Sequence, residues 1–266
     1  MPLEHILFPV DFSEACTAVS GYVEALARGS GARLTLLHVV AQMKDKREEQ
    51  LNQYLEPQLR HLSPVRVVAH GDPATEIVQF AGRDGVGLIM MPTRGTGVFR
   101  RLLLGSVTAK VLHDAACPVW TSSHSERITP ARFPYRTIAC ALDLSDRSAE
   151  TLRWAIRFAA EQNADLRAVH GIDVEEQSTN IGIVEVRRYL GEKASERWEA
   201  LKGETGFEGP LLIAYGSAGA AVRKAAHDLQ ADIVITGRGR VQAPFGRLRS
   251  NAYAIIRESP CPVISV

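Results

Sequence analysis

A glycine-containing and arginine-containing segment follows the apolar run 88–91, and its spacing suits phosphate binding. Gly95 is followed by nine residues and then by Gly105 and Ser106, where a helical pattern begins. Glycine permits positive φ angles and a close approach of the backbone to a ligand. The free N–H groups at a helix N-terminus favour an anion. The segment therefore predicts a site for the phosphate groups of a ligand.

An aspartate, Asp11, follows the first apolar run of the chain, residues 5–10. Its carboxylate can accept hydrogen bonds from a ribose hydroxyl, which would add a nucleoside contact to the phosphate site. A second interpretation needs no ligand. Asp and Ser side chains bond nearby backbone N–H groups, so Asp11 can simply shape a turn and Ser106 can be an ordinary helix N-cap. Both interpretations stay open at this point.

The pattern around Asp11 occurs twice in the chain. Asp11-Phe-Ser is matched by Asp143-Leu-Ser, 132 positions later, and His38 is matched by His170 with the same offset. Each histidine lies in an apolar run with no partner at metal-ligand spacing, so we expect a packed or hydrogen-bonded side chain. An internal repeat of this kind predicts two copies of one structural unit.

Later landmarks extend the repeat to the end of the chain. Gly71-Asp-Pro-Ala is matched by Gly216-Ser-Ala-Gly, and Cys117-Pro-Val by Cys261-Pro-Val. The offset rises to 145 at Gly216, so about thirteen residues are added in the second copy before that glycine. We predict a first domain at 1–124, an extended linker at 125–135, and a second domain at 136–266.

Apolar runs alternate with amphipathic stretches in each copy, as in successive βαβ units on a parallel sheet. In the first copy we expect strands at 5–10, 33–39, 65–70, 88–91 and 119–122, and helices at 13–30, 44–61, 73–83 and 106–115. In the second copy we expect strands near Thr137, Leu166, Leu211, Ile233 and Val263, and a long second helix at about 183–202. Ligands of open α/β sheets lie beyond the carboxyl ends of the strands, where the strand order reverses. This rule selects the segments after the first and fourth strands.

Composition limits the classes of protein. The chain has 266 residues, 45% of them hydrophobic and 23% charged, which is typical of a folded globular protein. Lysine and arginine number 31 against 30 acidic residues, so no overall field attracts nucleic acid or an anionic membrane. No run approaches the length of a membrane span and the start lacks a secretory signal, so we expect a cytoplasmic protein. The four cysteines show no disulfide or zinc spacing and are expected to be small core residues.

With these residues in place, the chain resembles the universal stress protein family over nearly its whole length, as two tandem family domains. Nucleotide-binding members carry Gly, two residues, Gly, nine residues and Gly-Ser/Thr after the fourth strand. Gly95, Gly105 and Ser106 match the later part, whereas Pro92 stands at the first glycine position. Proline offers no N–H and fixes φ near about −65°. The stretch 102–119 is also similar to the family's fourth helix and fifth strand.

The resemblance implies a fold and a ligand. The fold would be α/β: two tandem, open, five-stranded parallel sheets, Rossmann-like and similar to adenine nucleotide alpha hydrolases, with helices on both faces. The ligand would be ATP or another adenine nucleotide, with or without Mg²⁺. By position, the nucleotide-binding residues would be Pro9, Val10, Asp11, Val39, Met91, Pro92, Gly95, Gly105, Ser106 and Val107.

The second copy departs further from the pattern. One residue separates Gly237 from Gly239, and Arg249-Ser250 stands where the family has Gly-Ser. A side chain at Arg249 obstructs backbone contact, although its guanidinium is itself able to bind phosphate. The residues of this second, weaker or empty site would be Asp143, Gly237, Gly239, Arg249 and Ser250. Further arginines around the two loops are either phosphate ligands or solvated charge: Arg94, Arg100, Arg101, Arg238, Arg240 and Arg247.

Three functions remain. The first is a cytoplasmic stress-response protein that binds an adenine nucleotide in its first domain and acts as a sensor without catalysis. The second is an interaction module without nucleotide. The third is a weak ATP hydrolase, at most slow, because the P-loop lysine and other catalytic signatures are missing. In the family, fifth strands pair between domains, so the resemblance implies that 119–122 and 263–266 pair within one chain as a pseudo-dimer, with a homodimer as a further possibility. Neither nucleic acid nor membrane is expected as a partner.

Overall fold

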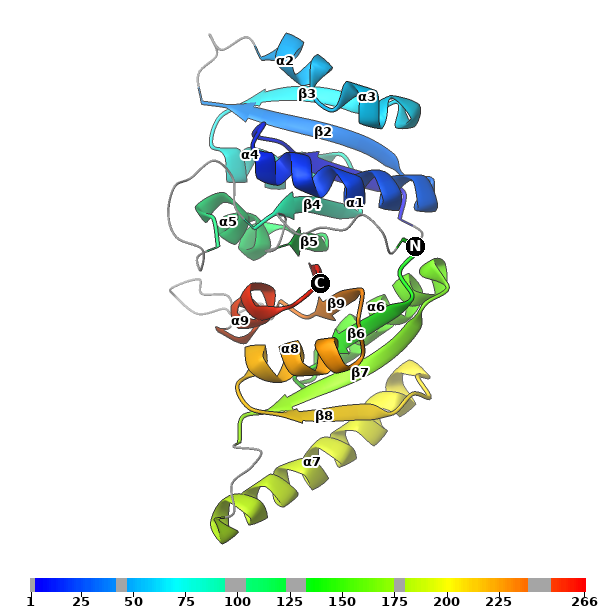
Figure 1. The fold of residues 1–266 in the computed structure, drawn as a ribbon, viewed down its shortest axis with the longest axis vertical. Coiled ribbons are helices and arrows are strands. Elements are labelled where there is room, and N and C mark those ends of the chain that lie inside the picture. The colour runs from blue at the N-terminus through cyan, green and yellow to red at the C-terminus, as the bar shows by residue number, and fades with distance from the viewer. Residues whose placement is uncertain (1–2, 42–46, 94–103, 123–132, 175–179, 239–249) are drawn as a thin grey trace. The chain divides into compact units, whose positions relative to one another are not determined.

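The computed structural model describes residues 3–41, 47–93, 104–122, 133–174, 180–238 and 250–266. The chain divides into two compact units, residues 1–134 and 135–266. Most of the linker that we predict at 125–135 lies outside the described residues. Each unit is an α/β structure built on a parallel sheet, as the sequence predicts (Figure 1).

Unit 1 contains five strands in its described residues, in the spatial order β3-β2-β1-β4-β5 and all parallel. The strands are β1 (His5–Pro9), β2 (Arg33–Val40), β3 (Val65–His70), β4 (Leu88–Pro92) and β5 (Val119–Ser122). The helices are α1 (Glu14–Ser30), α2 (Glu48–Gln53), α3 (Glu56–Leu59), α4 (Pro73–Arg83) and α5 (Ser106–Asp114), with a short 3-10 turn at Arg60–Leu62. Right-handed crossovers place α1 and α2 on one face and α4 and α5 on the other.

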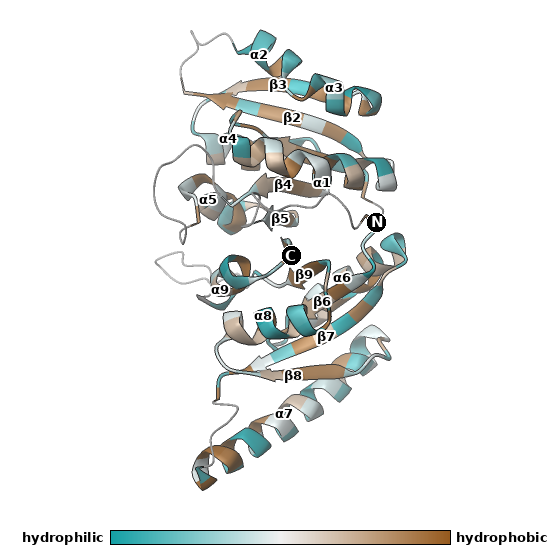
Figure 2. Cartoon of the chain, in the orientation of Figure 1, coloured by the Kyte–Doolittle hydropathy of each residue, from teal (hydrophilic) through white to brown (hydrophobic). Residues whose placement is uncertain are grey.

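Unit 2 repeats this order as β8-β7-β6-β9-β10. Its strands are β6 (Thr137–Ala141), β7 (Asp165–Ile172), β8 (Leu211–Tyr215), β9 (Ile233–Thr236) and β10 (Val263–Ser265). Its described helices are α6 (Ser148–Gln162), α7 (Ile181–Thr205), α8 (Ala218–Asp228) and α9 (Ser250–Glu258). Figure 2 shows apolar residues concentrated on the strands of both units, as expected for sheets covered by helices.

Local signals account for several helix ends. The Ser13 hydroxyl accepts a hydrogen bond from the Cys16 backbone N–H at 3.2 Å and so begins α1, and Gly31 ends it with φ of +66°. Asp72 begins α4 by accepting a hydrogen bond from the Thr75 N–H, with proline at the first helical position. These caps explain why α1 and α4 keep to the ranges predicted from the sequence.

The single helix that we predict at 44–61 is wrong. In the described part of this segment, α2 ends at Gln53 and α3 begins at Glu56, with Leu55 between them at φ of +56°. Pro57 explains the break, because a proline inside a helix removes a hydrogen bond and clashes with the preceding turn. In α3 the same proline occupies the first turn, where no N–H is needed.

Smaller features of the chain are also settled by the structure. β5 begins at Val119 and β10 at Val263, as the sequence predicts, and each Cys-Pro pair directly precedes its strand. Cys16 and Cys140 are buried, as expected of core residues, and Cys117 and Cys261 are partly exposed. The long helix expected at 183–202 is α7, three residues longer at its carboxyl end and two at its start.

His5 is a buried titratable group at the start of β1. Its Nε2 lies 2.9 Å from the Thr35 hydroxyl and its Nδ1 lies 2.8 Å from the Arg33 guanidinium. Nδ1 also lies 3.2 Å from the Asp84 carbonyl, which only accepts, so the Arg33 contact requires an unprotonated Nδ1 and the Asp84 contact a protonated one. Burial lowers the pKa of His5 below the ordinary 6.5; the hydrogen bond to the Asp84 carbonyl opposes this shift, and the Arg33 charge adds to it.

A lowered pKa makes unit 1 sensitive to acid. His5 binds a proton more readily in the unfolded chain than in the folded chain. The contribution of neutral His5 to the stability of the fold is therefore complete above pH 6.5 and is lost as the pH falls towards the folded pKa. We expect the free energy of unfolding, measured with urea at pH 7.5 and pH 5, to fall more in the wild type than in His5→Gln. Equal falls in the two proteins would contradict this role for His5.

Candidate functional site

The strand order of unit 1 reverses between β1 and β4. From β1 the chain passes to β2 and β3 on one side and returns to β4 on the other, where Ile6 pairs with Leu88 and Leu7 with Ile89. Ligands of open α/β sheets bind beyond the carboxyl ends of the strands at such a point. The residues that end β1 and β4 therefore share the edge where a ligand is expected.

The segment after β1 is held firmly against β2. The Val10 N–H donates to the Leu37 carbonyl at 2.8 Å, and the Val10 carbonyl accepts from His38 Nδ1 at 2.8 Å. The expectation that His38 is hydrogen-bonded is confirmed. Phe12 takes a left-handed backbone conformation, φ +61°, and its ring lies 4.3 Å from the His38 ring.

Asp11 lies at the turn into α1. Its Oδ1 accepts from the Ser13 N–H at 3.0 Å and from the Cys16 thiol at 3.1 Å. Burial and the neighbouring carboxylate of Asp11 raise the pKa of Cys16 to about 12, so the thiol keeps its proton and donates it. The turn-shaping role of Asp11 is confirmed by these contacts, and a nucleotide contact is an additional role that they do not test.

Two further residues border this edge. Val39 lies in β2, half-buried and paired with Ala69 of β3. Tyr54, just after α2, packs its ring 5.1 Å from Phe12, and its hydroxyl lies 3.0 Å from the Thr17 hydroxyl. Burial raises the pKa of Tyr54 to about 12. Nothing in the sequence points to Tyr54, because an unbroken helix at 44–61 predicts no turn at this residue.

Hydrogen bonds close the base of the loop that leaves β4. The Thr93 N–H and hydroxyl both donate to the Ser122 carbonyl of β5, each at 3.0 Å, and the Thr93 carbonyl accepts from the Gly105 N–H at 2.8 Å. Met91 and Pro92 are buried at the end of β4. The Pro92 carbonyl accepts from the Thr108 hydroxyl at 3.1 Å. The two ends of the loop are thus joined, while Gly95 and the rest of 94–103 lie outside the described residues.

Gly105 is the N-cap of α5, and Ser106 and Val107 are its first helical residues. Our alternative that Ser106 is the N-cap is therefore wrong, because the cap is one residue earlier. A glycine cap has no side chain to bond the first-turn N–H groups, and no side-chain cap bond is present among the described residues. These N–H groups and the helix dipole are available to an anion.

Unit 2 reproduces the turn after its first strand. The His170 Nδ1 donates to the Leu142 carbonyl at 2.8 Å, and Leu144 takes a φ of +55°. Asp143 Oδ1 accepts from the Ser145 N–H at 3.0 Å and from the hydroxyls of Ser145 and Ser148 at 2.6 and 3.0 Å. Ser148 thus replaces Cys16 as the donor from the following helix.

The second predicted loop is described only at its ends. Gly237 directly follows β9, and a Cβ added there would lie 2.9 Å from the Thr151 hydroxyl. The next residue, Arg238, donates its N–H to the Val266 carbonyl at 2.9 Å. Gly239 and Arg249 lie outside the described residues, and Ser250 is the first residue of α9.

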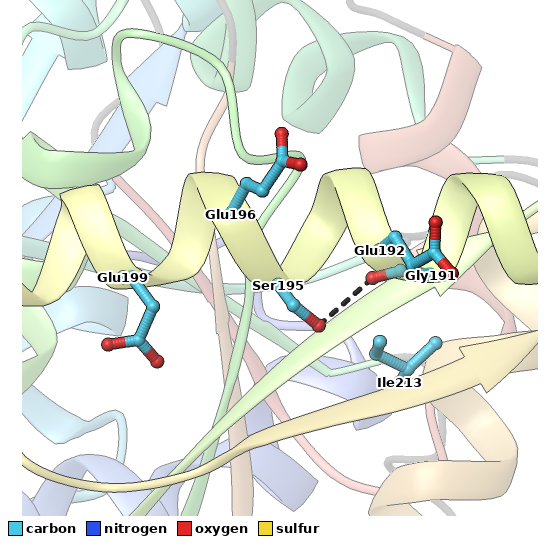
Figure 3. A pocket seen from close by; sticks show the side chains of 6 residues that line it. All are labelled: Gly191, Glu192, Ser195, Glu196, Glu199 and Ile213. Carbon is cyan, nitrogen blue, oxygen red and sulfur yellow. Dashed lines mark hydrogen bonds between the residues drawn. The ribbon is translucent and has the colours of Figure 1, made fainter.

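A shallow depression of about 640 Å³ lies elsewhere in unit 2, between α7 and β8 (Figure 3). It is lined by Gly191, Glu192, Ser195, Glu196, Glu199 and Ile213. None of these residues belongs to the predicted nucleotide site. Within the described residues, no cluster of His, Cys, Asp and Glu side chains could hold a metal ion. No helix in that part of the chain is long and apolar enough to cross a membrane.

Comparison with known proteins identifies the family. The model of the universal stress protein family matches residues 2–64, 41–122 and 134–266. The chain belongs to this family, and it carries two copies of the family's domain. A universal stress protein from Thermus aquaticus is 32% identical over 129 residues, which cover 94% of that protein and 43% of this chain. Nearly the whole of that protein therefore matches less than half of this chain.

Two solved structures resemble the whole chain. A functionally unknown protein from Pseudomonas aeruginosa has a TM-score of 0.72 at 17% identity, covering 99% of this chain and 92% of its own. A universal stress protein from Archaeoglobus fulgidus has a TM-score of 0.69 at 22% identity, covering 98% and 95%. At these identities the likeness shows the fold, and it confirms the predicted α/β architecture.

Proposed function

We propose that this universal stress protein binds ATP or a related adenine nucleotide in unit 1 and acts in the cytoplasm as a sensor without catalysis. The observation that carries the proposal is the arrangement at one sheet edge of two features. Asp11 follows β1, and α5 presents an N-terminus capped only by Gly105 close to the end of the adjacent strand β4. The Asp11 carboxylate suits a nucleoside hydroxyl, and the N-terminus of α5 suits phosphate.

Nine of the ten predicted contact residues belong to the described part of this arrangement. Pro9 ends β1 and is followed by Val10 and Asp11, Val39 lies in the neighbouring β2, Met91 and Pro92 end β4, and Gly105 caps α5, which begins with Ser106 and Val107. Mg²⁺ that arrives with the nucleotide would be held chiefly by the nucleotide's own phosphates, as is usual for this ion. Gly95 lies outside the described residues, and the ligand roles of all ten residues stay predictions.

Pro92 stands at the first glycine position of the family pattern, and this departure favours the interaction module. Pro92 ends a strand, and the group it contributes is its carbonyl, which accepts from Thr108 at the start of α5. That hydrogen bond needs no N–H from residue 92. It ties the first turn of α5 to the end of β4, so the anion-binding end of the helix is fixed to the sheet.

Gly105→Val tests the phosphate contact. Gly105 has φ of −61°, which valine adopts without strain, so the substitution adds a side chain at the helix N-terminus and leaves the backbone conformation accessible. We expect calorimetric titration to show at least about tenfold weaker binding of ATP, because the side chain blocks an approach that only glycine allows.

Gly82→Val is the matched control. Gly82 lies in α4, with nothing within 4 Å of an added Cβ. Gly82→Val should bind ATP with the affinity of the wild type in the same calorimetric titration. Unchanged ATP affinity in a folded Gly105→Val protein would show that phosphate does not lie at the start of α5.

A second candidate function, an interaction module, is favoured by a different observation. The first half of α7 exposes large apolar side chains, Ile181 at 77% and Tyr189 at 57% of their full accessible surface. Exposed apolar surface of this kind is typical of a protein contact. If wild-type protein gives no heat with ATP, this function replaces nucleotide sensing.

A further inference from the structure

The edge strand of unit 2 has an open hydrogen-bonding side. β8 pairs with β7 along its length, and the described residues supply no strand on its other side. The Gly216 N–H points inward, because it donates to the Ile172 carbonyl at 2.9 Å. Backbone groups alternate in direction along a strand, so those of Leu211, Ile213 and Tyr215 point outward.

The corresponding edge of unit 1 is protected by charge. Counting back from the matching glycines Gly71 and Gly216, Arg66 of β3 corresponds to Leu211, and His70 corresponds to Tyr215. The Arg66 guanidinium donates to the carbonyls of Leu51 and Tyr54, so it ties the segment around α2 to this edge. Charged residues and covering segments are the usual means by which proteins keep edge strands from pairing.

β8 itself carries no charge of this kind, and α7 runs beside it (Figure 1). The sequence of β8 is Leu-Leu-Ile-Ala-Tyr, with no charged residue, and Leu212 is 40% exposed. Beside Ile213 lies the depression of Figure 3, which α7 lines with the small residues Gly191 and Ser195 and with Glu192, Glu196 and Glu199. The space of about 640 Å³ leaves room for side chains of an added strand on the α7 face.

We propose that β8 is a self-association surface on which a second copy of this chain adds its own β8 in antiparallel orientation, about a two-fold axis at Ile213. This register places Ile213 opposite Ile213 of the partner subunit, and Leu211 opposite Tyr215 of the partner subunit. Every opposed pair is apolar, so the strand is complementary to itself without an unpaired charge. The outward N–H and C=O groups of these residues form the hydrogen-bonded pairs of an antiparallel ladder.

Charges on α7 favour a protein partner over a lipid surface. Near the depression, Arg188 pairs with Glu192, Lys193 with Glu196, and Lys202 with Glu199. Arg197 lies 3.9 Å from Asp146, and the Arg187 guanidinium lies over the Tyr215 ring, 5.7 Å from its centroid. Four of the five basic residues of α7 thus face carboxylates, whereas a helix that binds an anionic membrane presents unpaired basic residues. The exposed apolar residues toward the N-terminal end of α7 (Figure 2) add surface beside the strand.

Analytical ultracentrifugation of the full chain tests the proposal. Over micromolar to millimolar concentrations, the wild type should change from the mass of one chain to that of two. Leu211→Arg, which restores the residue type found at the matching position of β3, should weaken dimerisation at least about tenfold, because it opposes a charge to an apolar side chain across a two-fold axis. Val65→Arg, at a 47% exposed position of the other edge strand, should dimerise like the wild type.

A second variant removes the hydrogen bonds without adding a charge. Ile213→Pro deletes an N–H that points outward, so the pairing of β8 with β7 keeps its own hydrogen bonds. Circular dichroism must show both β8 variants folded, and both should then be monomers. A wild type that stays monomeric throughout, or folded β8 variants that dimerise like the wild type, would overturn the proposal. Binding of the wild type to anionic vesicles in place of dimerisation would also overturn it.

Discussion

Replacing Asp11 by alanine is expected to weaken ATP binding by about 10- to 100-fold, the loss that follows removal of one hydrogen bond to a charged group. Asp11 is placed for this contact by the turn after β1, where the Ser13 N–H and the Cys16 thiol hold Oδ1. Isothermal titration calorimetry of the purified variant, with circular dichroism to show that it is folded, measures the change.

Asp143→Ala is the matched control, because the repeat places Asp143 in the same turn of unit 2 with hydrogen bonds from Ser145 and Ser148. The two substitutions therefore remove equivalent structural contacts. If nucleotide binds in unit 1, Asp143→Ala keeps the wild-type affinity. Equal losses of ATP affinity in the two variants would show that the substitutions act through folding. A loss of affinity only in Asp143→Ala would show that the nucleotide binds in unit 2.

Phe8→Ala is expected to lower the free energy of unfolding by about 3–5 kcal/mol, the usual cost of truncating a buried phenylalanine. Phe8 is fully buried in β1, opposite Leu36 of β2, at the centre of the unit 1 sheet. The loss combines the transfer of the ring to water with the cavity left behind. Urea unfolding followed by circular dichroism measures it, and the transition of unit 1 should move to lower urea.

Val65→Ala provides the comparison at an exposed site. Val65 starts the edge strand β3 and is 47% exposed, so its truncation should change the free energy of unfolding by no more than about 0.5 kcal/mol. A Phe8→Ala protein that unfolds at the same urea concentration as Val65→Ala would contradict the central position of β1 in the core.

The strands and the helix caps were predictable because they depend on neighbours in the sequence. Alternating apolar runs locate the strands, and Ser13, Gly31 and Asp72 mark helix ends by their own side chains or backbone freedom. The break at Leu55 was missed because an apolar pattern continued through it, although Pro57 carried the signal. Weighing that proline above the pattern predicts two helices.

The hydrogen bonds that hold the candidate site together were not predictable, since they join residues far apart in the sequence. The Thr93 hydroxyl bonds to Ser122, and Thr108 bonds to Pro92, only because the sheet brings β4, β5 and α5 together. The hydrogen bond from the Cys16 thiol to Asp11 was likewise not predictable, because a cysteine outside any motif suggests only a small core residue. The repeat itself gave the strongest long-range information, since it predicts the matching turns at Asp11 and Asp143.

The repeat also shows at which matching positions the two copies carry different residues. Arg66 covers one sheet edge and Leu211 leaves the matching edge open, while the family's phosphate-loop residues Gly105 and Ser106 have only Arg249 and Ser250 as counterparts. We therefore expect the proposed nucleotide binding in unit 1 and the proposed association through unit 2 to be separable by mutation. Pairing of the fifth strands of the two units stays a prediction.

The most direct test of nucleotide sensing is the nucleotide content of the freshly purified wild-type protein. Denaturing the protein and separating the supernatant by anion exchange identifies and counts any bound nucleotide, and calorimetric titration with ATP then measures the affinity of emptied protein. We predict about one adenine nucleotide per chain, in keeping with one site in unit 1. Protein that carries no nucleotide and gives no heat with ATP would contradict the proposed function.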